Sequence, residues 1–281
     1  MRDPAHTRAV GQLLLTALCW SLAGVLFKYI GWSGLAAGAG RGLIAAGFLL
    51  AVSWRSLHFT WSPLQLGTAV AYTACTLLFA MANKLTTAAN AILLQYTAPI
   101  WAALFGAWLL RERPRPGDWA TIAVVLSGLG LFLYDGLQLG QLTGVLLATA
   151  SGVGFGLLPV LIRKQKDGSA LESIILGNLL CAAVGIPALL AAPALPASGW
   201  TALFVLGVVQ LGFSYLLYAR AVKHVTALEA VLIPVLEPVL NPVWVMLTLG
   251  ERPTPLALLG GAIVLGAVTT RAIVSIRTAR A

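Results

Sequence analysis

The feature that most constrains this chain is a series of apolar runs along its whole length, separated by short polar breaks. A membrane-spanning helix needs about 20 mostly apolar residues, and the runs have that length. Only 10% of the 281 residues are charged, whereas a typical soluble domain has about 25%. The pattern predicts an all-α polytopic membrane protein in contact with a lipid bilayer, with one membrane domain over residues 1–281.

Nine polar breaks divide the chain into ten candidate transmembrane helices. The first apolar run continues to about Ile30 without a small-residue cleavage site, so we expect a retained span and not a signal peptide. The breaks lie at residues 31–34, 54–63, 83–87, 111–117, 135–141, 163–170, 192–199, 220–226 and 250–254.

The distribution of basic residues tests this helix count, because cytoplasmic loops carry an excess of Lys and Arg. With the N-terminus inside, fourteen Lys and Arg fall on the cytoplasmic side, three on the opposite side, and Arg41 alone falls inside a span. We therefore expect a multi-pass protein of the cytoplasmic membrane with both termini in the cytoplasm. The net charge of +9 is then explained by topology, so nucleic acid is not an expected partner.

An internal repeat supports this topology. Residues 77–116 align with residues 216–255 at a constant offset of 139, matching Pro99 with Pro238 and Glu112 with Glu251. Each repeat then holds five helices, at 11–134 and 142–275, and an odd number inverts the second copy relative to the first. Inverted repeats of this kind build secondary transporters whose substrate binds near the bilayer midplane, between the repeats.

The loop GERPTP, the preceding EPVLNPVWVMLTL and the following LLGGAIVLGA resemble the EamA-type repeat of the drug/metabolite transporter superfamily. The resemblance covers nearly the full length and implies a ten-helix carrier that exports small metabolites. The aromatic-rich spans are also similar to those of the aromatic amino acid exporter branch.

Helical spacing predicts which residues face a substrate. Several polar and aromatic side chains recur on single helical faces, and the repeat aligns Thr76 and Phe79 with Tyr215 and Tyr218. Such faces should turn away from lipid, which offers no hydrogen bonds; the alternative is that they hold neighbouring helices together. The candidate substrate-binding residues are Trp20, Tyr72, Thr76, Phe79, Asn83, Gln95, Tyr215, Tyr218, Glu237, Asn241 and Trp244.

Glu237 is the acid that most requires an explanation. It lies ten residues from Ala227 and twelve from Leu249, which places it at the midplane, where a lipid-facing acid costs about 2.5 to 3.5 kcal/mol. Six other acids are expected at span ends in contact with water: Glu112, Asp118, Asp135, Asp167, Glu172 and Glu251. Glu237 could bind a substrate ammonium or carry a proton, and the alternative is a structural pairing with Arg41.

Prolines and glycines add two further expectations. Pro99 and Pro238 each remove a backbone donor, which frees a carbonyl one turn earlier, so they are candidate hinges. The glycine pairs Gly38/Gly42 and Gly152/Gly156 allow close helix packing within one chain, so we expect a monomer, with dimerisation as the alternative. Cys19, Cys75 and Cys181 lie in apolar runs and form no metal-binding spacing.

These patterns together predict a secondary exporter that works by alternating access. An aromatic cavity with few charges suits a small molecule with a flat apolar body and a polar head, best matched by an aromatic or other hydrophobic amino acid. The alternatives are another metabolite or a drug-like cation. An intramembrane enzyme is disfavoured because the sequence contains no H-E-x-x-H motif and no paired mid-membrane acids. The sequence also contains no Walker A motif, so we do not expect ATP to be the direct energy source. We expect no metal and no cofactor.

Overall fold

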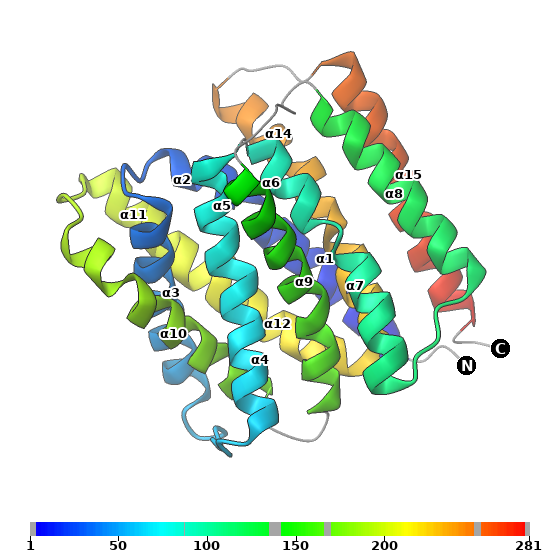
Figure 1. The fold of residues 1–281 in the computed structure, drawn as a ribbon, viewed down its shortest axis with the longest axis horizontal. Coiled ribbons are helices and arrows are strands. Elements are labelled where there is room, and N and C mark those ends of the chain that lie inside the picture. Colours follow the sequence, from blue (N-terminus) through cyan, green and yellow to red (C-terminus); the bar gives the residue numbers. More distant parts are fainter. Residues whose placement is uncertain (1–3, 87, 135–141, 166–169, 250–253, 279–281) are drawn as a thin grey trace.

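The computed structural model describes residues 4–86, 88–134, 142–165, 170–249 and 254–278, and all regular structure in these ranges is helical (Figure 1). The predicted all-α class is therefore confirmed for this part of the chain. The helices run side by side as a bundle, and the first turn of α1 and the last turn of α15 lie at the same end of it (Figure 1).

The first half of the chain builds five helical segments, and three of them are not a regular α-helix over their whole length. The π-helical turns η1 and η2 continue their spans, whereas a turn at Tyr96 and Thr97 separates α6 from α7 directly before Pro99. The elements are α1 (Pro4–Ser21), α2 (Ala23–Lys28), α3 (Gly34–Ser53), α4 (Pro63–Thr73), η1 (Ala74–Leu78), α5 (Phe79–Leu85), α6 (Ala88–Gln95), α7 (Ala98–Phe105), η2 (Gly106–Leu110) and α8 (Pro116–Leu133).

The second half repeats this order of segments. A π-helical stretch again lies inside the third segment, and the fourth is interrupted by the 3-10 turn η6, which contains Pro234. The elements are α9 (Leu142–Lys164), α10 (Ala170–Leu190), α11 (Ala197–Val205), η4 (Leu206–Phe213), α12 (Ser214–Ala221), η5 (Val222–His224), α13 (Ala227–Leu232), η6 (Ile233–Val235), α14 (Leu236–Leu249) and α15 (Pro255–Thr278).

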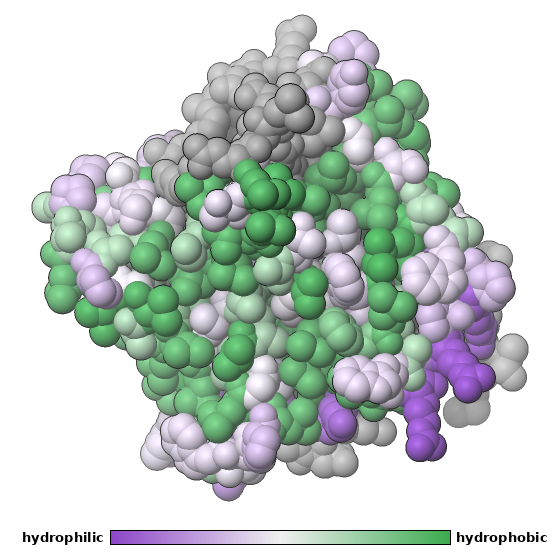
Figure 2. Space-filling view, viewed as in Figure 1, coloured by the Kyte–Doolittle hydropathy of each residue, from purple (hydrophilic) through white to green (hydrophobic). Residues whose placement is uncertain are grey.

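Length and composition mark this bundle as a membrane protein. Within the described ranges, seven helical stretches are long and apolar enough to cross a membrane, and α8 and α15 contain shorter apolar stretches. Large apolar side chains such as Leu43, Val70 and Leu104 are exposed, and apolar residues dominate the face shown in Figure 2. Such a surface suits lipid and not water. The count of ten spans stays a prediction.

Helices from the two halves pack against each other in matched pairs. The offset of 139 relates α1 to α9, α3 to α10, and α8 to α15. Accordingly α4 packs on α10 while η4 packs on α3, and α7 packs on α9 while α14 packs on α1. The self-related pairs α3 with α10 and α8 with α15 are also in contact. The halves are therefore interleaved and not separate bodies.

Glycines make the tightest of these contacts possible within one chain. A Cβ added at Gly152 would lie 2.8 Å from the Leu94 carbonyl oxygen, and one at Gly156 would lie 2.6 Å from the Ala98 carbonyl oxygen. Both positions place α9 directly against the span that contains Pro99. This pair of glycines is therefore used for helix packing within one chain.

We expect Gly156→Ala to destabilise the protein by about 1 to 3 kcal/mol, because the added methyl group meets backbone atoms that cannot move without shifting a helix. Gly47→Ala in α3 is the matched control, since nothing lies within 4 Å of a Cβ there. Thermal unfolding in detergent measures both. Equal melting temperatures for the two variants would contradict the prediction.

Candidate functional site

A cavity of about 360 Å³ lies at mid-depth between the two halves. Its volume is within the range of about 300 to 1,000 Å³ typical of small-molecule pockets. Trp20, Phe155, Tyr215 and Glu237 line its inner part, and the lining continues through Phe27 and Ile30 to the loop after α2. The cavity therefore extends from the middle of the bundle toward the end opposite to the start of α1.

The inner wall of the cavity is an aromatic cluster. Trp20 contacts Phe155, Tyr215 and Tyr218 at ring-centroid distances of 5.9, 5.1 and 5.4 Å, and its Nε1 donates a hydrogen bond to the Ser214 Oγ at 2.8 Å. Edge-to-face and tilted contacts of this kind hold the rings in fixed orientations. The cluster thus forms an aromatic floor with residues from both halves.

Glu237 lines the cavity and is anchored across the interface between the halves. The Tyr96 hydroxyl donates a hydrogen bond to Glu237 Oε2 at 2.7 Å. It also lies 3.4 Å from the Pro234 carbonyl oxygen, the group left without its helical donor by Pro238. One carboxylate oxygen therefore has a neutral partner from α6–α7, and the acid faces the cavity and not lipid.

The structure places the predicted site residues in three groups. Trp20, Thr76, Phe79, Gln95, Tyr215, Glu237 and Pro238 line the cavity. Tyr72 and Tyr218 are fully buried behind it; Tyr72 donates a hydrogen bond to Asn178 at 3.0 Å and packs on Tyr215 at 4.8 Å. The side chains of Asn83 and Asn241 lie outside the part of the chain that the structure describes.

Trp244 and Pro99 do not line the cavity but lie next to residues that do. The Trp244 Nε1 donates to the Ser21 Oγ at 2.8 Å, and Ser21 lines the cavity. Pro99 lies in the first turn of α7, just beyond the break that positions Tyr96. The two predicted hinge prolines thus stand next to interruptions of their spans, as hinges would require.

The π-helical turn η1 gives Gln95 a partner. The Cys75 carbonyl oxygen accepts hydrogen bonds from the Gln95 Nε2 at 3.2 Å and from the Ser151 Oγ at 2.7 Å, and Gln95 also donates to Ser151 at 2.8 Å. A π-turn releases backbone carbonyls from the helical ladder, and such turns are frequent at functional sites. The amide of Gln95 is therefore held in place at the cavity wall.

Sequence patterns missed three parts of the site: Tyr96, Phe155 and helix α3 with Arg41. Arg41 was considered as a structural partner of Glu237, but the structure shows no ion pair within 4.0 Å between these two described side chains. Arg41 instead donates to Gln210 Oε1 at 3.3 Å. Its position as the one basic residue inside a span was the signal that could have placed it in the cavity.

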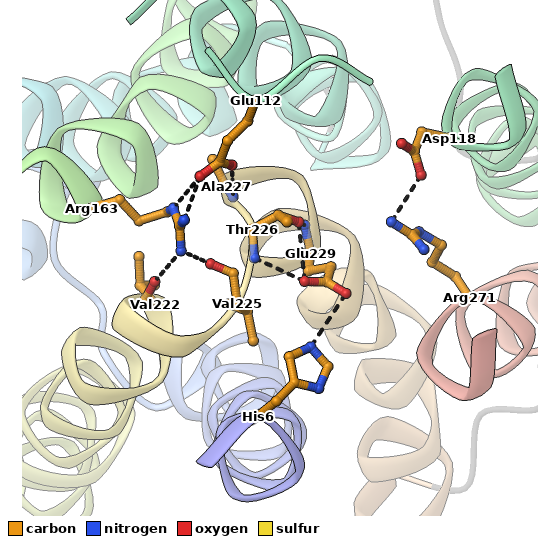
Figure 3. Close-up of polar contacts among 10 residues, drawn as sticks. All are labelled: His6, Glu112, Asp118, Arg163, Val222, Val225, Thr226, Ala227, Glu229 and Arg271. Atoms are coloured by element: carbon orange, nitrogen blue, oxygen red, sulfur yellow. Dashed lines mark hydrogen bonds and ion pairs between the residues drawn. The ribbon is translucent and has the colours of Figure 1, made fainter. Parts of the chain in front are cut away.

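A second polar cluster lies at the end of the bundle where α1 begins (Figure 3). We call this end the basic end; it contains His6, the loop of residues 111–115, Arg163, Lys223 and Arg271. Three pairs there each join the two halves: His6 with Glu229 at 3.5 Å, Arg163 with Glu112, and Arg271 with Asp118 at 2.8 Å. Purple hydrophilic residues gather near this end in Figure 2.

Glu112 and Arg163 each have further hydrogen-bond partners in this cluster. Arg163 Nε donates to Glu112 Oε1 at 2.7 Å, and its Nη1 donates to the carbonyls of Val222 and Val225. Glu112 Oε2 accepts from the Ala227 backbone N–H at 3.1 Å. The two side chains tie the loop before α8 to α9 and to the start of α13, so they link the two halves at the basic end.

The expectation that the acids at span ends are in contact with water is wrong for two of the six residues. Asp118 and Glu172 are both more than 90% buried. Asp118 Oδ2 accepts from the Arg115 N–H at 2.7 Å as well as pairing with Arg271, and Glu172 accepts from the His58 N–H at 2.6 Å. Capping and ion pairing replace water at these span ends. Glu251, Asp135 and Asp167 lie outside the described residues.

A bundle of apolar helices that encloses a mid-depth cavity between two related halves defines a polytopic membrane protein of the transporter class. The chain belongs to the EamA-like transporter family, whose family model matches residues 7–134 and again residues 142–270. The predicted membership of the drug/metabolite transporter superfamily is thus confirmed. The protein is a multi-pass membrane transporter of small molecules.

Two individual proteins are similar over most of the chain. The uncharacterized transporter YwfM of Bacillus subtilis (strain 168) is 27% identical over 274 residues, which cover 90% of each chain. A protein of known crystal structure superimposes with a TM-score of 0.81 over 99% of both chains at 22% identity. The second likeness concerns the fold alone.

Proposed function

We propose that this protein exports aromatic and other hydrophobic amino acids across the cytoplasmic membrane by alternating access. The observation that carries the proposal is the mid-depth cavity, whose floor is the aromatic cluster and whose inner part holds one acid, Glu237. The flat ring of an aromatic amino acid can stack on such a floor while the amino group of the same molecule reaches the Glu237 carboxylate. The resemblance of the aromatic-rich spans to the aromatic amino acid exporter branch favours the same class of substrate.

The proposed topology is ten helices in two inverted repeats, 11–134 and 142–275, with both termini in the cytoplasm. The matched packing of the two halves supports a twofold relation between them, and the two family matches, at 7–134 and 142–270, fall on nearly the same residue ranges. The basic end then faces the cytoplasm, in accord with the positive-inside rule. The cavity accordingly faces the outside in this conformation.

Alternating access requires that this conformation alternate with one in which the basic end opens. The pairs that close this end, including Arg163 with Glu112, each connect one half to the other. Rocking of the halves would separate these pairs while closing the cavity from the other side. Pro99 and Pro238, beside the interrupted spans, are the proposed hinges.

We expect proteoliposomes that contain this protein and are loaded with labelled tryptophan to release the label several times faster than protein-free vesicles. Release should be competed by phenylalanine and tyrosine, since both carry the same polar head on a flat ring. An arm loaded with ethidium tests the rival substrate class, because Glu237 would also attract a drug-like cation. Release of ethidium without release of any amino acid would replace this proposal by that rival.

A further inference from the structure

Arg41 is a buried cation that faces the cavity, and among the described residues no acid lies within 4.0 Å of it. Its side chain lies in the middle of α3, is 6% exposed and lines the cavity. A guanidinium has five N–H donors and stays charged at every physiological pH. The structure gives it one side-chain acceptor, the Gln210 Oε1 at 3.3 Å, and an aromatic contact with Phe27 at 5.1 Å from the ring centroid.

Two contacts restrain the guanidinium. Its central carbon lies over the Phe27 ring, and Gln210 from the second half of the chain accepts a hydrogen bond from its Nη1. Burying a charge is costly unless it is paired and hydrogen-bonded. The remaining donors therefore form a preorganised fork that fits the two oxygens of a carboxylate.

The two charges of the cavity wall select the class of ligand. Among the described lining residues, Arg41 and Glu237 are the charged ones, and they are not within 4.0 Å of each other. A simple cation would leave Arg41 uncompensated, and a dianion such as phosphate would be repelled by Glu237. A zwitterion satisfies both groups, because its two opposite charges lie on one small molecule.

We propose that Arg41 binds the carboxylate of a zwitterionic amino acid whose ammonium is bound by Glu237. The inference rests on the proposed function and deepens it by assigning the second pole of the substrate. Arg41 belongs to the first half and is bonded to Gln210 of the second, whereas Glu237 belongs to the second half and is bonded to Tyr96 of the first. The bound molecule would thus connect the two halves of the transporter.

Four indole probes test this proposal by binding to the purified full-length protein in detergent. L-tryptophan carries both poles, indole-3-propionate only the carboxylate, tryptamine only the ammonium, and indole neither. We expect Arg41→Gln to weaken binding of tryptophan and indole-3-propionate about tenfold to a hundredfold. Binding of tryptamine should not weaken, because its amino group has no need of Arg41.

Two further variants keep the test independent of misfolding. Gln210→Glu places an acid where the Arg41 partner now lies, so it should compete with the ligand carboxylate and reproduce the loss for the two carboxylate probes alone. Arg55→Gln is the control, since Arg55 also stacks on an aromatic ring, Trp54 at 5.0 Å, but does not line the cavity. It should bind all probes as the unaltered protein does.

The outcomes separate this inference from the proposed function. If binding of indole-3-propionate depends on Arg41 but tryptophan is not exported, the inference of a carboxylate site at Arg41 is supported and the proposed amino acid export is contradicted. Tryptophan export with the same preference for tryptophan over tryptamine in Arg41→Gln as in the unaltered protein would overturn the inference alone. Absence of Arg41-dependent binding for every carboxylate probe would overturn it as well.

Discussion

Replacing Glu237 by Gln should raise the KM for tryptophan efflux about tenfold to a hundredfold, because an amide has almost the shape of the carboxylate but no charge for the substrate ammonium. The effect is expected to be large because the acid lies in a cavity at the midplane, where few water molecules screen it. Binding of indole-3-propionate, which has no ammonium, should not weaken. Efflux from proteoliposomes and binding in detergent measure these two quantities.

The same variant distinguishes the two roles that the position of Glu237 allows. If the acid carries a proton in place of binding the ammonium, the KM stays near its original value while the dependence of efflux on pH disappears. Glu172→Gln is the control, since that acid is buried on α10 and bonded to the His58 backbone, away from the cavity. Unchanged efflux kinetics and pH dependence in Glu237→Gln would reject both roles.

Arg163→Ala should shift the transporter toward the conformation in which the basic end is open. The change removes the partner of Glu112 and the donor to the carbonyls of Val222 and Val225. Both side chains of the pair are about one quarter exposed, so we expect a loss of about 1 to 3 kcal/mol from the closed conformation. The population of the open conformation then rises about tenfold to a hundredfold.

Labelling of a cysteine at position 103 reports this opening. Ala103 lines the space at the basic end and is buried in the closed conformation, so its thiol should react with maleimide faster in Arg163→Ala. The native cysteines are buried and are replaced by serine in all samples. Arg113→Ala is the control, since its exposed side chain lies in the same loop. Equal labelling rates in the two variants would contradict a closing role for Arg163.

Much of the cavity wall was predictable from helical spacing alone. Trp20, Thr76, Phe79, Gln95 and Tyr215 were placed on inward faces because lipid cannot satisfy hydroxyl and amide groups, and each lines the cavity. Helical spacing could not distinguish residues that line the cavity from residues that are buried behind the cavity wall. Tyr72 and Tyr218 share the predicted faces but are buried among other rings, since depth along a face depends on how closely the neighbouring helices approach.

The hydrogen-bond partners of the cavity residues were less predictable than the helix faces on which these residues lie. Tyr96 follows Gln95 directly and would lie off its face on a regular helix, but the break before Pro99 turns its hydroxyl to Glu237. Arg41 was noticed as a basic residue inside a span, yet its acceptor Gln210 is 169 residues away. Pairings over such separations depend on helix packing, which no local pattern encodes.

The sequence by itself determined that the chain is an apolar helical membrane protein, that it is internally repeated, and that it belongs to its transporter family. Those properties follow from local composition and from duplication, because the hydrophobic free energy of a span and the similarity of two segments are sums over neighbouring residues. Only the tertiary structure decided which charges face one cavity and which ion pairs close the basic end. Burial and electrostatic pairing act between residues distant in the chain, so they arise only when the helices have packed.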